Sequence, residues 1–291
     1  MIKLSEYTVF TDSACDIDRE TLDKWGVKYC GLLFTFNDSE KEYSNYDMGV
    51  KEFYEKMRNG AVAKTSAANV ETFKKMFEPE LQNGNNILYL AFSSGLSTTI
   101  NSASIAADDL KEKYPDRRVV IVDSLSASAG YGLLLYLTVM QKKSGATIDE
   151  AEKFVKDNRL HLCHWFTVDN LVYLKRGGRI SPTAALLGSV LGIKPILHMD
   201  NDGHLINVSK VRGRHASVAA IAEKYGELAL TPNEGTVFIS HGDCPEDAEA
   251  LKNIMKQKYG IKVAYIADIG PVIGAHSGPG TLALFFLGKE R

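Results

Sequence analysis

Hydrophobic and polar positions change their spacing repeatedly along this 291-residue chain, from strand-like runs to helical periodicity and back. In the first half, the pattern predicts strands at residues 7–11, 27–36, 86–92 and 118–122. It predicts helices at residues 17–24, 47–58, 69–81, 97–113, 126–142 and 148–158. Such alternation indicates a parallel sheet that is covered by helices on both faces.

The second half continues in the same way. Strands are expected at residues 160–167, 193–199, 204–209, 236–240, 262–266 and 281–287. Helices are expected from residue 169, across 216–228 and across 245–258, and Ser181-Pro182 resembles the start of another. Asp200-Asn-Asp-Gly203 is a hairpin signal. We therefore expect a two-domain α/β protein, with an N-terminal domain of residues 1–160 and a C-terminal α/β domain of residues 161–291.

Composition narrows the class of protein. Hydrophobic residues make up 45% of the chain, charged residues 24%, and the formal net charge is −2, as is usual for a soluble globular protein. This charge gives no reason to expect nucleic acid as a partner, and at most a transient contact with a membrane surface. The first residues lack the apolar core of a signal peptide, and the four cysteines form no C-x-x-C pair. We expect a cytoplasmic protein with reduced thiols.

Residues 270–280, Gly-Pro-Val-Ile-Gly-Ala-His-Ser-Gly-Pro-Gly, form the most distinctive segment. Glycine lets the backbone approach a ligand closely, and proline stiffens it. We interpret the segment as a rigid loop that directs His276 towards a ligand. The alternative is a tight structural turn before the last strand.

Serine, threonine and glycine gather where several strands should end. The clusters are Thr11-Asp-Ser13, Thr65-Ser66, Ser93-Ser-Gly-Leu-Ser97 and Asp123-Ser124. Ligands of open α/β sheets bind at the carboxyl ends of the strands. Hydroxyls and free N–H groups at a helix start suit an anion such as a carboxylate or a phosphate. Simple helix capping by the Ser93–Ser97 cluster is the alternative, and a binder of a phosphorylated small molecule also fits.

These clusters occur together with Arg176-Gly-Gly-Arg-Ile-Ser181, Lys194-Pro-Ile-Leu197 and the 270–280 segment. In this order they resemble the DegV family of bacterial fatty-acid-binding proteins, over nearly the whole chain. The resemblance implies a carrier of one long-chain fatty acid that needs no cofactor or metal and is not an enzyme by itself. It also implies that the protein presents the carboxylate to a separate ATP-binding fatty acid kinase subunit, which makes acyl phosphate for phospholipid synthesis.

The resemblance assigns site residues by motif. Thr65 and Ser97 are the leading carboxylate contacts, Ser94 is the reserve for Ser97, and His276 is the cationic or hydrogen-bonding neighbour. Two departures leave acyl-chain preference and partner pairing open. Ala67-Ala-Asn69 stands where many relatives carry Gln-Pro-Ser, and Thr98-Thr-Ile100 stands where Gly-Thr-Tyr is usual.

Apolar runs at residues 184–193 and 132–136 could line an acyl tunnel, although an ordinary core role explains most of them. Arg176, Arg179 and Arg212 belong to two basic clusters that could dock a partner. Alternatively, they complement a helix dipole or form a solvated face.

An enzyme remains the second reading, as an acyl hydrolase or transferase that uses Ser97 with His276. The chain lacks the G-x-S-x-G elbow of lipases and the G-x-x-x-x-G-K-[ST] nucleotide loop. Neither Ser240-His-Gly-Asp-Cys244 nor His161-Leu-Cys-His164 predicts a site, because the first is not a triad and the second lacks further zinc ligands.

Overall fold

The computed structural model describes residues 7–181 and 192–291. The parallel sheet predicted for the first half is present, with strand order β2-β1-β6-β7. Its strands are β1 (Tyr7–Asp12), β2 (Val27–Cys30), β6 (Asn86–Ala91) and β7 (Val119–Asp123). The surrounding helices are η1 (Ser13–Cys15), α1 (Arg19–Trp25), α3 (Val70–Gln82), α4 (Thr99–Lys113), α5 (Ser128–Lys143) and α6 (Ile148–Asn158).

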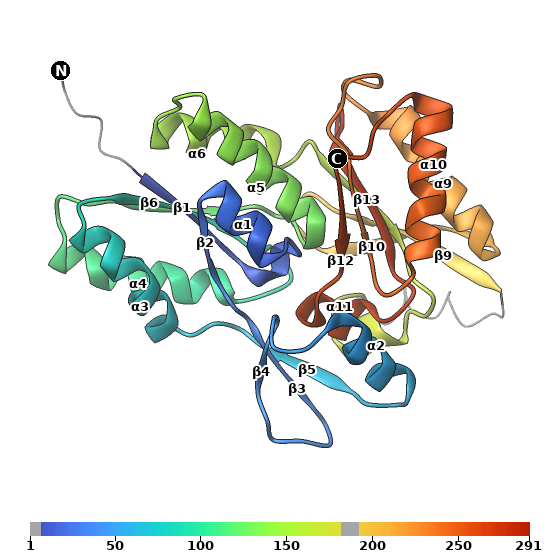
Figure 1. Ribbon diagram of the computed structural model, residues 1–291, viewed down its shortest axis with the longest axis horizontal. Coiled ribbons are helices and arrows are strands. Elements are labelled where there is room, and N and C mark those ends of the chain that lie inside the picture. The colour runs from blue at the N-terminus through green and yellow to red at the C-terminus, as the bar shows by residue number, and fades with distance from the viewer. Residues whose placement is uncertain (1–6, 182–191) are drawn as a thin grey trace.

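Along each strand of this sheet, successive side chains lie on opposite faces of the sheet. Phe10 and Tyr89 pack with α3 and α4 on one face. Val9 and Leu90 pack with α1, α5 and α6 on the other. Figure 1 shows the two helical layers on either side of the sheet. This confirms the expectation of helices on both faces.

The second half builds a six-stranded mixed sheet with strand order β10-β9-β8-β13-β11-β12. Its strands are β8 (Leu162–Thr167), β9 (Ile193–Met199), β10 (Leu205–Arg212), β11 (Phe238–His241), β12 (Tyr265–Asp268) and β13 (Leu282–Leu287). Its helices are α7 (Val172–Arg176), α9 (Arg214–Leu228), α10 (Pro245–Tyr259) and α11 (Pro271–Ser277). Only β11 and β12 pair in parallel, and β9 and β10 form the predicted hairpin.

One face of the six-stranded sheet packs on α9 and α10 through residues such as Trp165 and Leu284. The other face carries Phe166 and Phe285 and joins the same hydrophobic core as α5. Helix α5 therefore lies between the two large sheets (Figure 1). Strands before α6 belong to different sheets from those after it. We keep the domain division at residue 160 as a proposal, because the core runs across it.

The prediction of a single strand at residues 27–36 is wrong. It is two strands in different sheets, β2 and β3 (Leu33–Phe36), and β3 pairs antiparallel with β4 (Tyr43–Ser44) and β5 (Ala63–Ser66). At the break, the backbone N–H of Leu32 donates to Ser13 Oγ at 2.9 Å. Phe34 and Phe36 then pack on α2 (Val50–Arg58). Continuous strand-like composition does not reveal that the chain changes sheets.

Two expectations for the middle of the chain lie outside the described residues. These are the helix that begins at Ser181-Pro182 and most of the apolar run at residues 184–193. Within the described ranges, no helix is long and apolar enough to cross a membrane.

Candidate functional site

The sequence predicts a rigid loop at residues 270–280, and this prediction is wrong. The segment contains the helix α11. Pro271 occupies the first turn, where its missing N–H costs nothing. The Gly270 N–H donates to Asp16 Oδ1 at 2.9 Å, which fixes the start of the helix. Gly274 suggests a loop in the sequence, but a Cβ there would lie 2.5 Å from the Tyr54 hydroxyl. Its role is close packing of the helix.

His276 lies in the last turn of α11 and meets Thr65, which belongs to β5. The distance between His276 Nε2 and Thr65 Oγ1 is 2.8 Å. His276 Nδ1 is buried and has no hydrogen-bond partner within residues 7–181 and 192–291. It lies against Gly177, where a Cβ would come within 2.2 Å of Nδ1. The first glycine of the Arg176-Gly-Gly-Arg179 motif therefore makes room for the histidine ring.

The environment of His276 keeps its ring neutral at physiological pH. Burial, and to a lesser extent the nearby Arg179 guanidinium, together lower the pKa of His276 to about 4. The imidazole is therefore a hydrogen-bonding group rather than a cation.

Arg179 supplies the positive charge of the site. Its Nε and Nη2 donate to the Leu96 carbonyl at 3.1 and 2.9 Å, and Nη1 donates to the Gly177 carbonyl at 2.5 Å. Among the ion pairs of the described residues, none involves Arg179. Burial lowers the pKa of Arg179 from its usual value, but an arginine stays charged at physiological pH. The guanidinium is oriented by carbonyls, and the described residues provide no carboxylate counter-ion for it.

The Ser93–Ser97 segment contributes the next polar groups. Ser97 Oγ lies 2.9 Å from Thr99 Oγ1 and accepts from the Thr99 N–H at 3.2 Å, so Ser97 lies just before α4, which begins at Thr99. Ser94 is exposed, and its N–H donates to Asp123 Oδ1 at 3.3 Å. Ser93 is buried and donates to the Gly203 carbonyl at 2.9 Å. The Ser97 hydroxyl thus accepts from the first N–H of α4, although the N-cap residue Thr98 makes no side-chain cap hydrogen bond, and Ser97 as a residue is half-buried.

A cavity of about 530 Å³ brings the four carboxylate candidates together. Arg179 lines the same cavity, as does Ser277, whose buried Oγ has no hydrogen-bond partner in the described part of the chain. Sequence reasoning assigned Arg179 to partner docking and gave Ser277 no role. The remaining candidates lie elsewhere: Arg176 is exposed beside the Tyr173 ring, and Arg212 is exposed at the end of β10. The carboxylate candidates in the cavity wall are Thr65, Ser94, Ser97 and His276.

A second, smaller cavity of about 60 Å³, here called the inner cavity, adjoins the first. The two share the wall residues Ala127, Leu174, Leu205, Ile273 and Ser277. Its other walls come largely from the sheet face that looks towards α5. The apolar run at residues 132–136 does not line either cavity, and Leu133 to Leu135 are ordinary core. No sequence signal identifies this wall, because its residues come one or two at a time from many elements.

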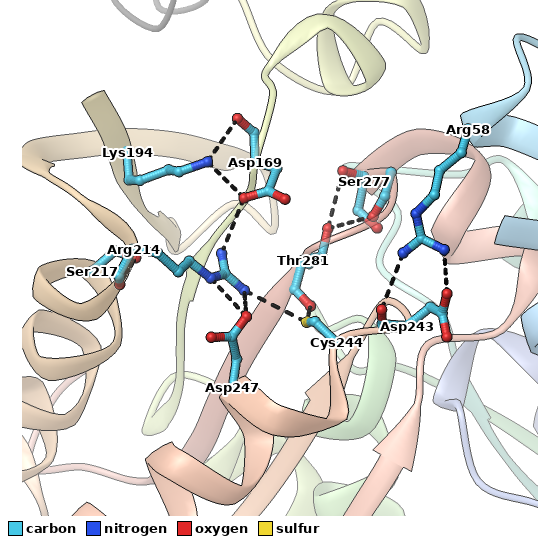
Figure 2. Close-up of polar contacts among 11 residues, drawn as sticks. Arg58, Asp169, Lys194, Arg214, Ser217, Asp243, Cys244, Asp247, Ser277 and Thr281 are labelled. Carbon is cyan, nitrogen blue, oxygen red and sulfur yellow. Dashed lines mark hydrogen bonds and ion pairs between the residues drawn. The ribbon is translucent and has the colours of Figure 1, made fainter. Parts of the chain in front are cut away.

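Figure 2 shows polar contacts close to α7 and α11. Asp169, just before α7, pairs with Lys194 at 2.6 Å and with Arg214 at 3.6 Å. Thr281 Oγ1 donates to the carbonyls of Ser277 and Gly278 and so satisfies the end of α11. These contacts fix the backbone positions of α7 and α11, which carry the Gly177–His276 contact.

The contacts of the site suit anion binding better than nucleophilic catalysis. A serine nucleophile needs a base within hydrogen-bond reach, and that base needs an orienting partner. Ser97 contacts Thr99, whereas His276 contacts Thr65 and its Nδ1 has no partner. Among the described residues, no group of three or more metal-ligating side chains is placed to hold a metal ion.

Known proteins match the chain over almost its whole length. A family model described as an uncharacterised protein of the DegV family matches residues 6–289. A DegV domain-containing protein from Clostridium perfringens is 44% identical over 289 residues, which are 99% of this chain and 99% of that protein.

Solved structures share the fold. A DegV lipid-binding protein from Thermotoga maritima has a TM-score of 0.85 at 29% identity, covering 98% of this chain and 99% of its own. A stearic acid-binding protein from Eubacterium ventriosum has a TM-score of 0.88 at 26% identity, with 97% and 98% covered. The α/β architecture derived above is thus the architecture of proteins described as binding lipids.

Proposed function

Since this chain belongs to the DegV family, we propose that it binds one long-chain fatty acid. Solved relatives are described as binding lipid or stearic acid. One observation carries the proposal: hydroxyls, an imidazole and a guanidinium converge on a cavity that continues into a small, almost wholly apolar one. A fatty acid has the matching chemistry, with a charged head and an apolar chain.

The head group is proposed to lie beside Thr65, Ser97 and His276, with Ser94 in reserve. Hydroxyls can donate to a carboxylate, and the uncompensated charge of Arg179 attracts it. The Thr65 hydroxyl contacts His276, and the Ser97 hydroxyl contacts Thr99. Each hydroxyl can donate to a ligand carboxylate instead of, or in addition to, its present partner. Ser277 is a further donor in the same wall, because its Oγ has no partner.

The acyl chain is proposed to run from this head-group site towards the inner cavity. Leu174, Leu205 and Ile273 line both cavities and form a continuous apolar wall. Burying roughly fourteen methylenes at about 0.8 kcal/mol each offers ~11 kcal/mol before the entropy cost of binding. The apolar term therefore supplies most of the affinity, and the polar groups set the direction of the ligand.

Presentation of the carboxylate to an ATP-binding fatty acid kinase subunit is part of the proposal. Ser66, Ala67, Ser94 and Thr98 line the first cavity and are exposed, so a partner can approach the head group there. The exposed Arg176 and Arg212 are proposed docking residues, whereas Arg179 is better suited to the ligand. In this scheme the chain works as a carrier in bacterial phospholipid synthesis, and the phosphoryl transfer belongs to the partner.

Mass spectrometry of the purified, denatured protein tests the ligand. A co-purified fatty acid near one equivalent supports the carrier. A phosphorylated small molecule in its place rejects the proposal. Turnover of acyl esters that is lost in Ser97→Ala would instead identify a hydrolase.

A further inference from the structure

Helix α11 contributes a large part of the wall of the first cavity. Its residues in that wall are Val272, Ile273, His276 and Ser277. Two of them carry a buried polar atom, His276 Nδ1 and Ser277 Oγ, for which the described ranges provide no hydrogen-bond partner. The position of this one helix therefore determines where both polar groups lie relative to a ligand.

Two side chains from the N-terminal half hold the start of α11. Asp16 Oδ1 accepts a hydrogen bond from the Gly270 N–H at 2.9 Å, and Asn45 Oδ1 accepts one from the Val272 N–H at 2.8 Å. Pro271, which lies between these donors, has no N–H. The first N–H groups of a helix have no partner within the helix itself. Asp16 and Asn45 therefore satisfy donors that α11 cannot satisfy alone.

The surroundings of these hydrogen bonds are tightly packed. Asp16 and Asn45 are both buried, and a Cβ on Gly270 would lie 2.6 Å from Asn45 Nδ2 and 3.1 Å from Asp16 Oδ1. Just before the helix, the buried Tyr54 hydroxyl donates to the Ile269 carbonyl at 3.0 Å. The start of α11 therefore cannot move without leaving buried polar groups unpaired, which is costly.

Asp16 is itself held in place on its other side. Its Oδ2 lies 2.5 Å from the Oγ of Ser128, the first residue of α5, and this Oγ lies 3.0 Å from Ser240 Oγ. Burial raises the pKa of the Asp16 carboxyl to about 8. A neutral carboxyl group has one accepting and one donating oxygen, so it resembles an amide in its hydrogen bonding. Asp16 thus serves α11 as a hydrogen-bond acceptor rather than as a charge.

We propose that Asp16 and Asn45 are positioning residues of the head-group site. They hold the first turn of α11 so that His276, in the last turn, meets Thr65 at the cavity wall. Neither Asp16 nor Asn45 lines the first cavity, so both act through the helix and not by touching the ligand. This inference rests on the proposed fatty-acid binding and extends it to residues that no ligand contact would identify.

Calorimetry with stearate tests the proposal on the full chain. Asp16 has a φ of +51°, so Asp16→Gly removes the carboxyl without adding backbone strain. This variant should bind stearate roughly tenfold more weakly than wild type, because it leaves a buried N–H of α11 unpaired. Asp16→Asn keeps the accepting oxygen and should restore the affinity. Phe77→Leu, a core change on α3 away from both cavities, controls for a general loss of stability and should leave the affinity unchanged.

Nitrogen NMR of the His276 ring gives a second readout in protein without ligand. The Nε2 resonance reports the contact with Thr65, so it should shift in Asp16→Gly. It should stay in place in Asp16→Asn and in Phe77→Leu, since a core change elsewhere does not move α11. This measurement needs no fatty acid. If wild type fails to bind stearate, the proposed function fails, and the NMR comparison still tests the positioning.

Several outcomes would overturn the inference. In Asp16→Gly, wild-type affinity or an unchanged His276 resonance would each show that the carboxyl does not position α11. Asp16→Asn as weak as Asp16→Gly would assign the effect to charge, and an equal loss in Phe77→Leu would assign it to stability. If Asp16→Gly does not fold, Asn45→Ala decides, because it frees only the Val272 N–H. Weaker stearate binding with a shifted His276 resonance would then support the proposal, and the absence of either would reject it.

Discussion

Thr65 Oγ1 and His276 Nε2 lie 2.8 Å apart although 211 positions separate the two residues in the chain. The contact joins β5 of the small antiparallel sheet to α11, next to the six-stranded sheet. A ligand carboxylate that binds here must insert beside this pair or replace one of its hydrogen bonds. The proposed head-group site therefore depends on the relative positions of the two halves of the chain.

Removing either hydroxyl should weaken fatty-acid binding without unfolding the protein. Thr65→Ala and Ser97→Ala should each lose about 1–3 kcal/mol of affinity for stearate, the range for a lost hydrogen bond to a charged group. Thr65→Ser retains the hydroxyl and is the matched control. Calorimetric affinities that stay unchanged in both alanine variants would reject the assignment.

Ligand binding should be accompanied by proton uptake at His276. Burial and Arg179 hold its pKa at about 4 in the free protein. A bound carboxylate favours imidazolium and raises this pKa, so the complex takes up a fraction of a proton near pH 6. Calorimetry in two buffers of different ionisation enthalpy measures this fraction. The uptake should be absent in His276→Gln, and equal uptake in both proteins would assign the proton elsewhere.

The stability of the free protein should fall as the pH is lowered from about 6.5 to about 4. The folded pKa of His276 lies below its unfolded value, so in this window the unfolded chain binds more protons. Between the two pKa values, one such histidine lowers the free energy of unfolding by at most about 1.4 kcal/mol for each unit by which the pH falls. Denaturant unfolding of wild type and His276→Gln measures the difference, and the variant should show the shallower decline. Identical pH profiles would mean that His276 does not titrate as described.

Two adjacent glycines should respond differently to alanine. Gly177 has a helical φ of −73°, and the three described atoms nearest to an added Cβ all belong to His276. Gly177→Ala should cost about 1–3 kcal/mol of stability by overpacking, and the second change His276→Ala should recover most of it. Gly178 has φ of +69° with open space around it. Gly178→Ala should cost about 1–2 kcal/mol through backbone strain, with no recovery.

The arginines should separate ligand binding from presentation. With ATP, magnesium and oleate, the chain alone should make no acyl phosphate, and product should appear when a fatty acid kinase subunit is added. Arg212→Ala should retain oleate binding but slow this reaction, most clearly at low salt, where surface charges act strongly. Arg179→Ala should weaken binding itself. If Arg212→Ala has no effect at low salt, its side chain is part of a solvated face.

Much of the fold can be predicted from the sequence, because the spacing of hydrophobic residues indicates which side of each helix or strand is buried. The helix capped by Asn69 and the β9–β10 hairpin around Asp200–Gly203 follow from local signals alone. The sequence does not indicate a strand end that is set by contacts with distant parts of the chain. Where residues 27–36 divide between two sheets, the Leu32 N–H donates to Ser13, and local composition does not indicate this contact between distant residues.

The candidate site shows the same limit. Hydroxyl and histidine positions were identifiable by motif, and the cavity contains Thr65, Ser94, Ser97 and His276. The helical conformation around Gly274 was missed, because its packing partner Tyr54 is distant in sequence. His164, which predicts no zinc site in the sequence, is a buried residue of the core beside Phe285.

Tyr136 on α5 contacts Trp25 of the N-terminal half and Phe238 of the C-terminal half, with ring centroids 5.3 and 5.8 Å away. A single helix thus supplies interior surface to both large sheets. Unfolding of one half would expose part of the hydrophobic core of the other half. We therefore expect the protein to unfold on heating in a single calorimetric transition. The same sharing makes the halves poor modules for recombination: a fragment that ends near residue 160 would carry α5 with one apolar side uncovered.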